Sequence, residues 1–142
     1  MRRVLVIFVL ITGSACSSPS GPSSVGAATD ISGAWSGTFA SSNNPTMQLG
    51  MTITQTGSTV SGTWTSTSVD WNGQITGNMD GSSFSGQLAF TGTAASGSVC
   101  TGTANIAGTA STSSVSFTSS TGVTGATCPA PLPAGIQIDL HR

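Results

Sequence analysis

The sequence predicts an all-β fold, an eight-stranded antiparallel up-and-down β-barrel. From Asp30 onward, eight segments alternate apolar and polar residues with period two, and no window has a helical period. Threonine, valine, isoleucine and aromatic residues, which favour strands, are frequent in these segments, and the chain contains no lysine or glutamate. Short turns containing glycine join several neighbouring segments, so consecutive strands are expected to pair in order. A β-sandwich or an open β-roll is the alternative.

The eight expected strands follow one another with few residues between them. They cover residues 31–39, 47–55, 59–66, 69–79, 82–90, 99–108, 114–118 and 135–142. Gly57-Ser58 is expected to form a type II′ turn and Asp80-Gly81 a type I′ turn, because the twist of these two turns matches that of paired strands. Closing the meander into a barrel pairs the first strand with the last and removes the exposed edges.

Glycine occupies many positions that the alternation assigns to the buried face. In the first strand, Gly33 and Gly37 alternate with Ile31, Trp35 and Phe39. Further glycines of this parity are Gly62, Gly73, Gly77, Gly86, Gly102 and Gly108. The strands of a small barrel coil sharply, and inward glycines relieve crowding where they bend. Because glycine has no side chain, these positions either leave a cavity inside the barrel or are filled by neighbouring groups. We expect a filled core.

The beginning of the chain predicts export. Two arginines precede residues 4–11, an apolar run too short to span a bilayer, so residues 1–15 are expected to be a signal peptide. The segment Gly13-Ser14-Ala15-Cys16 resembles a bacterial lipobox, with Gly13 in place of the usual leucine. This resemblance makes Cys16 the expected lipid acceptor. Cleavage by an ordinary signal peptidase is the alternative.

Residues 16–29 are expected to be the lipidated cysteine and a flexible tether rich in serine, proline and glycine, followed by a barrel domain of residues 30–142. A lipid on Cys16 would make the membrane a partner and place the protein in the bacterial cell envelope. As in bacterial lipoproteins generally, Ser17 after the cysteine is compatible with sorting to the outer membrane in a Gram-negative host.

The chain has three cysteines, an odd number for an exported protein. Lipidation of Cys16 leaves Cys100 and Cys128, which are expected to form a disulfide. Up-and-down topology puts both at the barrel end opposite Trp35, so they can meet. Closing a loop of this length contributes about 3–4 kcal/mol in the entropy model. A structural role is favoured over a redox role because the pair has no C-x-x-C spacing.

Charge and composition exclude several classes of function. Charged residues make up 5% of the chain, and after removal of the leader four aspartates oppose Arg142 alone, which leaves a net charge of −3. Nucleic acid is therefore not an expected partner. His141 is the only histidine and has outward parity, so no Ser-His-Asp set is expected. No carboxylate pair or metal-ligand cluster is visible, and neither catalysis, a metal nor another cofactor is expected.

The segment Gly33-Ala34-Trp35 at the start of the first strand resembles the G-x-W motif of the calycin superfamily, which comprises lipocalins and avidin-like proteins. The resemblance implies an eight-stranded barrel in which a basic residue from the last strand packs over the tryptophan and closes one end. Arg142 is the basic residue in that position here, with inward parity. Such a cation–π contact contributes about 0.5–2 kcal/mol. No match to avidin-type biotin contacts is found.

Five large apolar residues fall at the opposite end of the predicted barrel: Phe39, Met47, Trp64, Trp71 and Phe90. They either line an open mouth or plug that end as core. The family resemblance favours the first, an envelope-anchored lipoprotein that binds a small hydrophobic or amphipathic ligand. The alternative is a structural or interaction lipoprotein with a filled barrel. A weaker alternative is an inhibitor of a secreted hydrolase that acts through the loop at residues 40–46.

Overall fold

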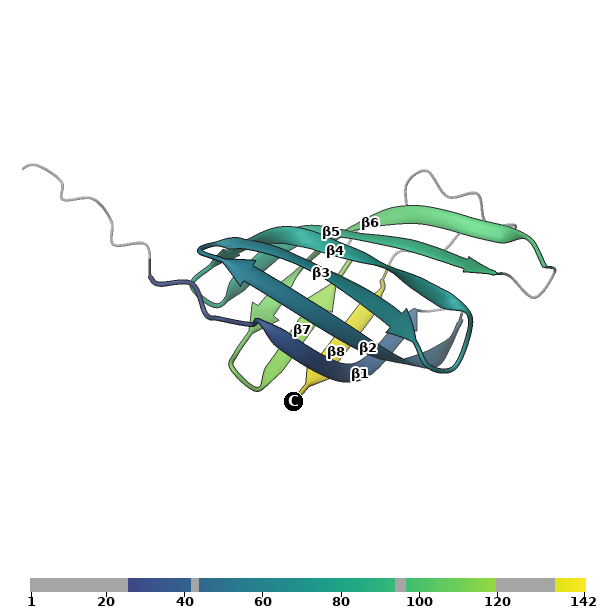
Figure 1. Cartoon of the computed structure of the whole chain (residues 1–142), viewed down its shortest axis with the longest axis horizontal. Helices are drawn as coiled ribbons and strands as arrows, with labels where there is room; N and C mark the ends of the chain where they lie inside the picture. The colour runs from purple at the N-terminus through teal and green to yellow at the C-terminus, as the bar shows by residue number, and fades with distance from the viewer. Residues whose placement is uncertain (1–25, 42–43, 94–96, 120–134) are drawn as a thin grey trace, which may run out of the picture.

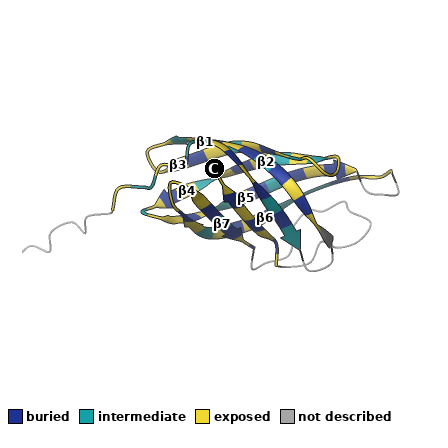
Figure 2. Cartoon of the chain, turned by 90° about the horizontal axis from the view of Figure 1, so that it is seen from below, coloured by how far each residue is buried: buried dark blue, intermediate teal, exposed yellow. Residues whose placement is uncertain are grey.

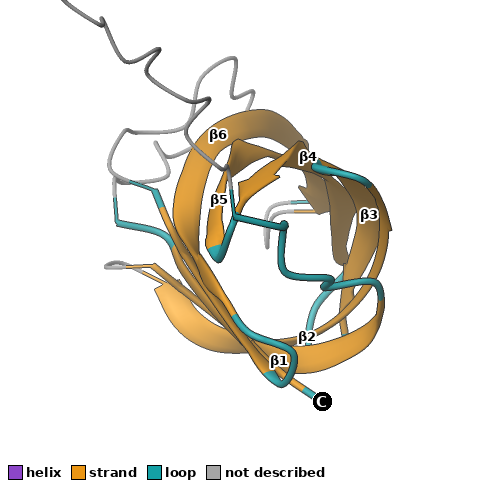
Figure 3. Cartoon of the chain, turned by 90° about the vertical axis from the view of Figure 1, so that its left-hand side faces the viewer, coloured by secondary structure: helices purple, strands orange, loops and turns teal. Residues whose placement is uncertain are grey.

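The computed structural model describes residues 26–41, 44–93, 97–119 and 135–142, which form a closed antiparallel barrel of eight strands in chain order (Figures 1 and 3). The strands are β1 (Gly33–Ser41), β2 (Asn44–Thr56), β3 (Thr59–Ser66), β4 (Trp71–Asp80), β5 (Ser83–Thr93), β6 (Val99–Ala110), β7 (Ser114–Thr118) and β8 (Gln137–His141). The predicted up-and-down barrel is confirmed, and the sandwich and open-roll alternatives are wrong. The described residues contain no helix long and apolar enough to cross a membrane.

The ring closes where β1 pairs with β8. Phe39 of β1 lies opposite Met47 of β2 on one side and Ile138 of β8 on the other, and the β8 ladder continues to Ser36, which pairs with His141. β8 also pairs with β7, and β7 pairs with the last residues of β6. Every strand therefore has a partner on each side over at least part of its length, although β6 pairs with β7 only at residues 107–110. This closure reduces the free edges through which sheets aggregate.

One of the two predicted hairpin turns lies where it was expected, and the other is shifted by one residue. The β2–β3 loop is Gly57-Ser58, as expected. In the second hairpin Asp80 pairs with Ser83, so the loop is Gly81-Ser82 and not Asp80-Gly81. The glycines of these loops have φ of 60° and 57°, whereas no described non-glycine residue has positive φ. This pattern matches type II′, in which only the first residue is left-handed, so the type I′ prediction is wrong.

Several strands extend beyond their predicted limits, whereas β1, β4 and β8 each begin two residues later than predicted, at Gly33, Trp71 and Gln137. β2 begins at Asn44 and β5 continues to Thr93. β1 runs to Ser41, so most of the stretch at residues 40–46 is strand and not a rim loop; residues 42–43 lie outside the described part. Backbone hydrogen bonds continue a ladder beyond the last side chain that faces the core. The alternation of apolar residues stops at that side chain, so it cannot predict the rest of the strand.

The core lies inside the barrel and consists of one cluster of buried residues. Buried and exposed positions alternate along each strand, as the blue and yellow bands of Figure 2 show. The buried apolar residues are Ile31, Trp35, Phe39, Met47, Leu49, Met51, Ile53, Val60, Trp64, Ile75, Met79, Phe84, Leu88, Phe90, Cys100, Ala104, Ile106, Ala110, Val115, Phe117, Ile136, Ile138 and Leu140. Side chains from all eight strands or their flanks therefore meet in one apolar interior.

The inward glycines let neighbouring backbone approach closely. A Cβ atom built on Gly37, Gly73 or Gly108 would overlap a carbonyl oxygen of the adjacent strand. Gly77 and Gly86 lie opposite each other, and the edge of the Phe84 ring fills the space that both leave. The glycines thus allow tight coiling and a filled core.

Gly108→Ala should destabilise the barrel by about 1–3 kcal/mol, because the new Cβ would overlap the carbonyl oxygen of Ser116 on β7. Gly50→Ala is the matched control, since a Cβ added there meets no atom within 4 Å. Its effect should stay within about 1 kcal/mol. Urea unfolding followed by tryptophan fluorescence measures both variants, and equal stability losses would contradict the packing argument.

Candidate functional site

At one end of the barrel the structure brings together Gly33, Trp35 and Arg142. The guanidinium carbon of Arg142 lies 4.3 Å from the centre of the Trp35 ring, within cation–π range. Gly33 has φ of 122°, a conformation that favours glycine, and a Cβ there would come within 3.1 Å of Arg142 Nη1. The first residue of the G-x-W segment therefore allows both the backbone bend and the approach of the arginine.

Hydrogen bonds fix the same residues. Arg142 donates from Nε to the Thr112 carbonyl and from Nη1 to the Ser32 carbonyl, both at 2.6 Å. The Trp35 indole N–H donates to the Ile31 carbonyl at 2.8 Å. A buried indole N–H needs such a partner, and bonds from a charged donor are stronger than neutral ones. Arg142 thus links the end of the chain to the entry into β1 and to the β6–β7 turn.

The segment before β1, residues 29–32, crosses this end of the barrel, and we call it the strap (Figure 3). Ile31 is fully buried, and its amide donates to Gln55 Oε1 at 3.0 Å. The Thr29 amide donates to the Gly81 carbonyl at 2.7 Å. The strap therefore joins β1 to the β2–β3 and β4–β5 hairpins, and its isoleucine covers the core beneath.

Asp30 of the strap is exposed, and its ionisation is affected by its neighbours. Its carboxylate accepts a hydrogen bond from the Ser32 amide at 2.9 Å. This bond, with help from the Ser32 hydroxyl and the positive charge of Arg142, lowers the pKa of Asp30 below its usual value. His141, the neighbour of Arg142, is exposed on the outer face. The described residues include no group of three or more His, Cys, Asp or Glu side chains that could hold a metal ion.

The opposite end holds the five apolar residues expected there, and aromatic rings pack against one another. Phe39 and Trp64 stack at 6.2 Å between ring centres, and Trp71 and Phe90 stack at 5.5 Å. The exposed fractions of Phe39, Trp64 and Phe90 are 5%, 2% and 5%, and Met47 is also buried. Trp71 is only partly buried and packs against the edge of the core. Four of the five residues therefore belong to the core.

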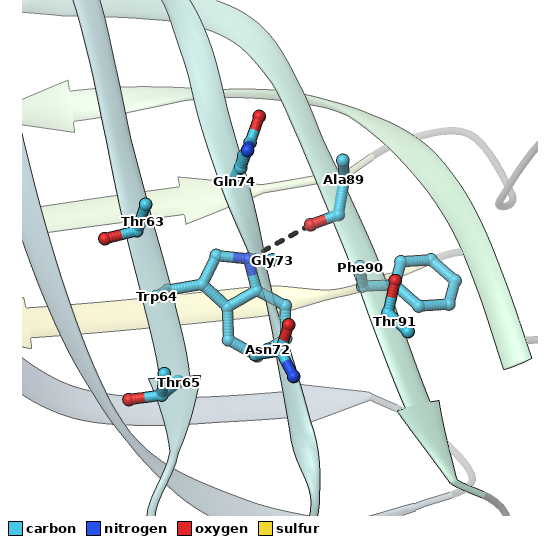
Figure 4. Close-up of a pocket in the computed structure, with 9 residues that line it drawn as sticks. All are labelled: Thr63, Trp64, Thr65, Asn72, Gly73, Gln74, Ala89, Phe90 and Thr91. Carbon is cyan, nitrogen blue, oxygen red and sulfur yellow. Dashed lines mark hydrogen bonds between the residues drawn. The ribbon is translucent and has the colours of Figure 1, made fainter. Parts of the chain in front are cut away.

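Two glycines position the indoles at this end. The Trp64 ring extends from β3 across Gly73 of β4, and its N–H donates to the Ala89 carbonyl of β5 at 3.1 Å (Figure 4). The Trp71 ring lies against Gly92, its partner on β5. Any side chain at either glycine would collide with the ring, so the two glycines and the two tryptophans form a matched set.

Cys100 is the second residue of β6 and lies at the same end of the barrel. Its side chain is buried and takes part in a disulfide. Its expected partner, Cys128, lies outside the described residues. The first 25 residues also lie outside the described part. They include the expected signal peptide, Cys16 and most of the tether.

A shallow groove of about 390 Å³ lies on the outer face of β3, β4 and β5 at the level of Gly73 (Figure 4). Its polar walls are Thr63, Thr65, Asn72, Gln74 and Thr91. A second groove of about 340 Å³ runs on toward β2, and the two share Thr63 and Gln74. Sequence reasoning did not single out these residues, because outward polar positions of a strand look alike until the pairing register is known.

Fold and site geometry together define a small closed up-and-down β-barrel. A strap and an arginine cover one end, and stacked aromatic rings lie near the other. This architecture is compatible with a calycin-like fold. No protein-family model, curated protein or solved structure matches the chain.

Arg142→Met should lower the free energy of unfolding by about 1–2 kcal/mol, because it removes the cation–π contact and two hydrogen bonds of this exposed arginine. Arg142→Lys keeps the charge but not the planar donor geometry, so its loss should be intermediate. His141→Gln, an exposed neighbour, is the control and should change stability by less than about 0.5 kcal/mol. Urea denaturation measures all three; a methionine variant as stable as the control would refute the closure.

Proposed function

We propose that the chain is an exported bacterial lipoprotein, anchored in the cell envelope through Cys16, whose calycin-like barrel is filled and acts through its outer surface. This is the interaction-protein alternative of the sequence analysis. A closed barrel with a packed core is a rigid, aggregation-resistant support for a binding surface.

The observation that carries this proposal is the burial of the aromatic end. Phe39 and Phe90 are 5% exposed, and Trp64 is 2% exposed with its indole N–H already bonded to a carbonyl. A ligand inside the barrel would have to displace stacked rings, and each displaced ring would lose its packing and burial energy. The described part of the interior therefore favours a structural core over a carrier site.

A second candidate, a small apolar ligand, is supported by Trp71. This residue is partly exposed, and so are the two exposed large apolar residues among those described. Val69, 43% exposed, lies in the β3–β4 connection, and Val99, 61% exposed, is the first residue of β6. A ligand on this rim would contact Trp71 without entering the core.

Titration with the apolar dye N-phenylnaphthylamine separates the two candidates. The dye should leave the tryptophan fluorescence of the membrane-extracted protein unchanged, because the indoles of Trp35 and Trp64 are buried. A saturable quenching that Trp71→Leu abolishes and Trp35→Phe preserves would contradict the interaction-protein proposal and support the ligand-binding candidate.

Cys16→Ser should abolish incorporation of labelled palmitate and move the protein from the membrane fraction to the soluble fraction. A thiol at that position is the expected acceptor, and the serine variant lacks it. Cys128→Ala, which removes a different cysteine, is the control and should keep the label. Labelling that persists in Cys16→Ser would show that the anchor is wrong.

A further inference from the structure

We propose that the outer face of β2–β5 binds a neutral polysaccharide. This inference rests on the proposed function, in which the outer surface acts. It adds a site and a class of ligand: the two adjoining grooves, and an uncharged polymer rich in hydroxyl groups.

The two grooves share Thr63 and Gln74 and form one continuous surface, which we call the groove face. The strands that carry it, β2 to β5, are joined by regular ladders, with Thr52 opposite Thr63 and Thr63 opposite Gln74. Its outward polar residues are Thr52, Thr54, Ser61, Thr63, Thr65, Asn72, Gln74, Thr76 and Thr91. Four strands at roughly 4.8 Å spacing make a surface about 14 Å across, which suits an extended polymer better than one small molecule.

The side chains of the groove face are free to bind a ligand. Within the part of the chain that the structure describes, none of these nine side chains hydrogen-bonds to another protein group. Polar residues elsewhere on the outer face do: Gln87 donates to Asn105 at 3.2 Å, and Ser116 and Gln137 both donate to Asp139. The groove face is thus distinct from outward positions whose polar groups are already paired.

The chemistry of the face selects a neutral, hydroxylated ligand. Hydroxyl and amide groups each donate and accept hydrogen bonds, as sugar hydroxyls do, and threonine methyl groups can pack against the C–H surface of a sugar ring. None of the residues that line either groove is charged. The barrel domain has a net charge of −3 from its four aspartates and Arg142, so a polyanion would be repelled and gain no ion pair.

The floor of the groove is held in place from inside the barrel. The Trp64 indole crosses Gly73 beneath the groove and bonds to the Ala89 carbonyl, which ties β3 to β5 over β4 (Figure 4). The ring is buried and stacked on Phe39. A rigid floor presents Asn72 and Gln74 at fixed positions, which lowers the entropy cost of binding.

Affinity electrophoresis of the full membrane-extracted protein tests this inference. Native gels contain dextran, mannan or a mixed-linkage β-glucan as neutral probes, and alginate as the anionic probe. Retardation by at least one neutral polymer is expected, with none by alginate. The double variant Asn72→Ala/Gln74→Ala should bind that polymer about tenfold more weakly, because two hydrogen-bonding groups are lost.

Gln87→Ala/Asn105→Ala is the matched control, since it removes the same residue types from the same outer surface where they bond to each other. It should keep the affinity, and urea midpoints verify that both variants fold. Absence of retardation in every neutral gel, equal retardation by alginate, or equal loss in the two double variants would each overturn the inference. A different experiment tests the proposed function: saturable quenching of the tryptophan fluorescence by the apolar dye would contradict it, whatever the gels show.

Discussion

The structure depends on one spatial constraint, the small interior of an eight-stranded barrel. Strands at this curvature come so close on their inner side that a Cβ at Gly37 or Gly108 would overlap backbone of the next strand. Glycine removes the conflict and leaves room for large rings, so Trp64 lies across Gly73 and Trp71 against Gly92. The positions of the glycines therefore determine where the aromatic side chains lie, and through them the shape of the core.

The contacts at the two ends of the barrel differ in kind. At the Trp35 end, Ile31 covers the core and Arg142 joins distant segments through directional, charge-assisted hydrogen bonds. At the Cys100 end, the contacts are stacked aromatic rings and a disulfide that includes Cys100. Closure at the first end orders the entry of the chain into β1, which the barrel needs in order to pair β1 with β8.

Much of this arrangement could be predicted because a strand repeats with period two. Alternation indicated the number of strands and the inward parity of residues such as Ile138, and the G-x-W resemblance placed Arg142 beside Trp35. Features that depend on register could not be predicted. The loop Gly81-Ser82 is shifted by one residue from the expected turn. The hydrogen bond from the Ile31 amide to Gln55 Oε1 joins the strap to a side chain 24 residues away, and such a contact leaves no pattern in the sequence.

The uncharged exterior follows from the same closed architecture and limits what the surface can recognise. Open sheets commonly carry charged residues on their edge strands to prevent association, whereas a closed ring needs fewer of them. Solubility can then be provided by hydroxyl and amide groups. Those groups are not equivalent, because cross-strand register decides which ones satisfy each other, as Gln87 and Asn105 do, and which ones, such as Gln74, keep their hydrogen-bonding capacity. The side chains of the groove face keep this capacity above the floor that Trp64 holds in place. Free polar groups on a fixed backbone are what the proposed binding surface requires.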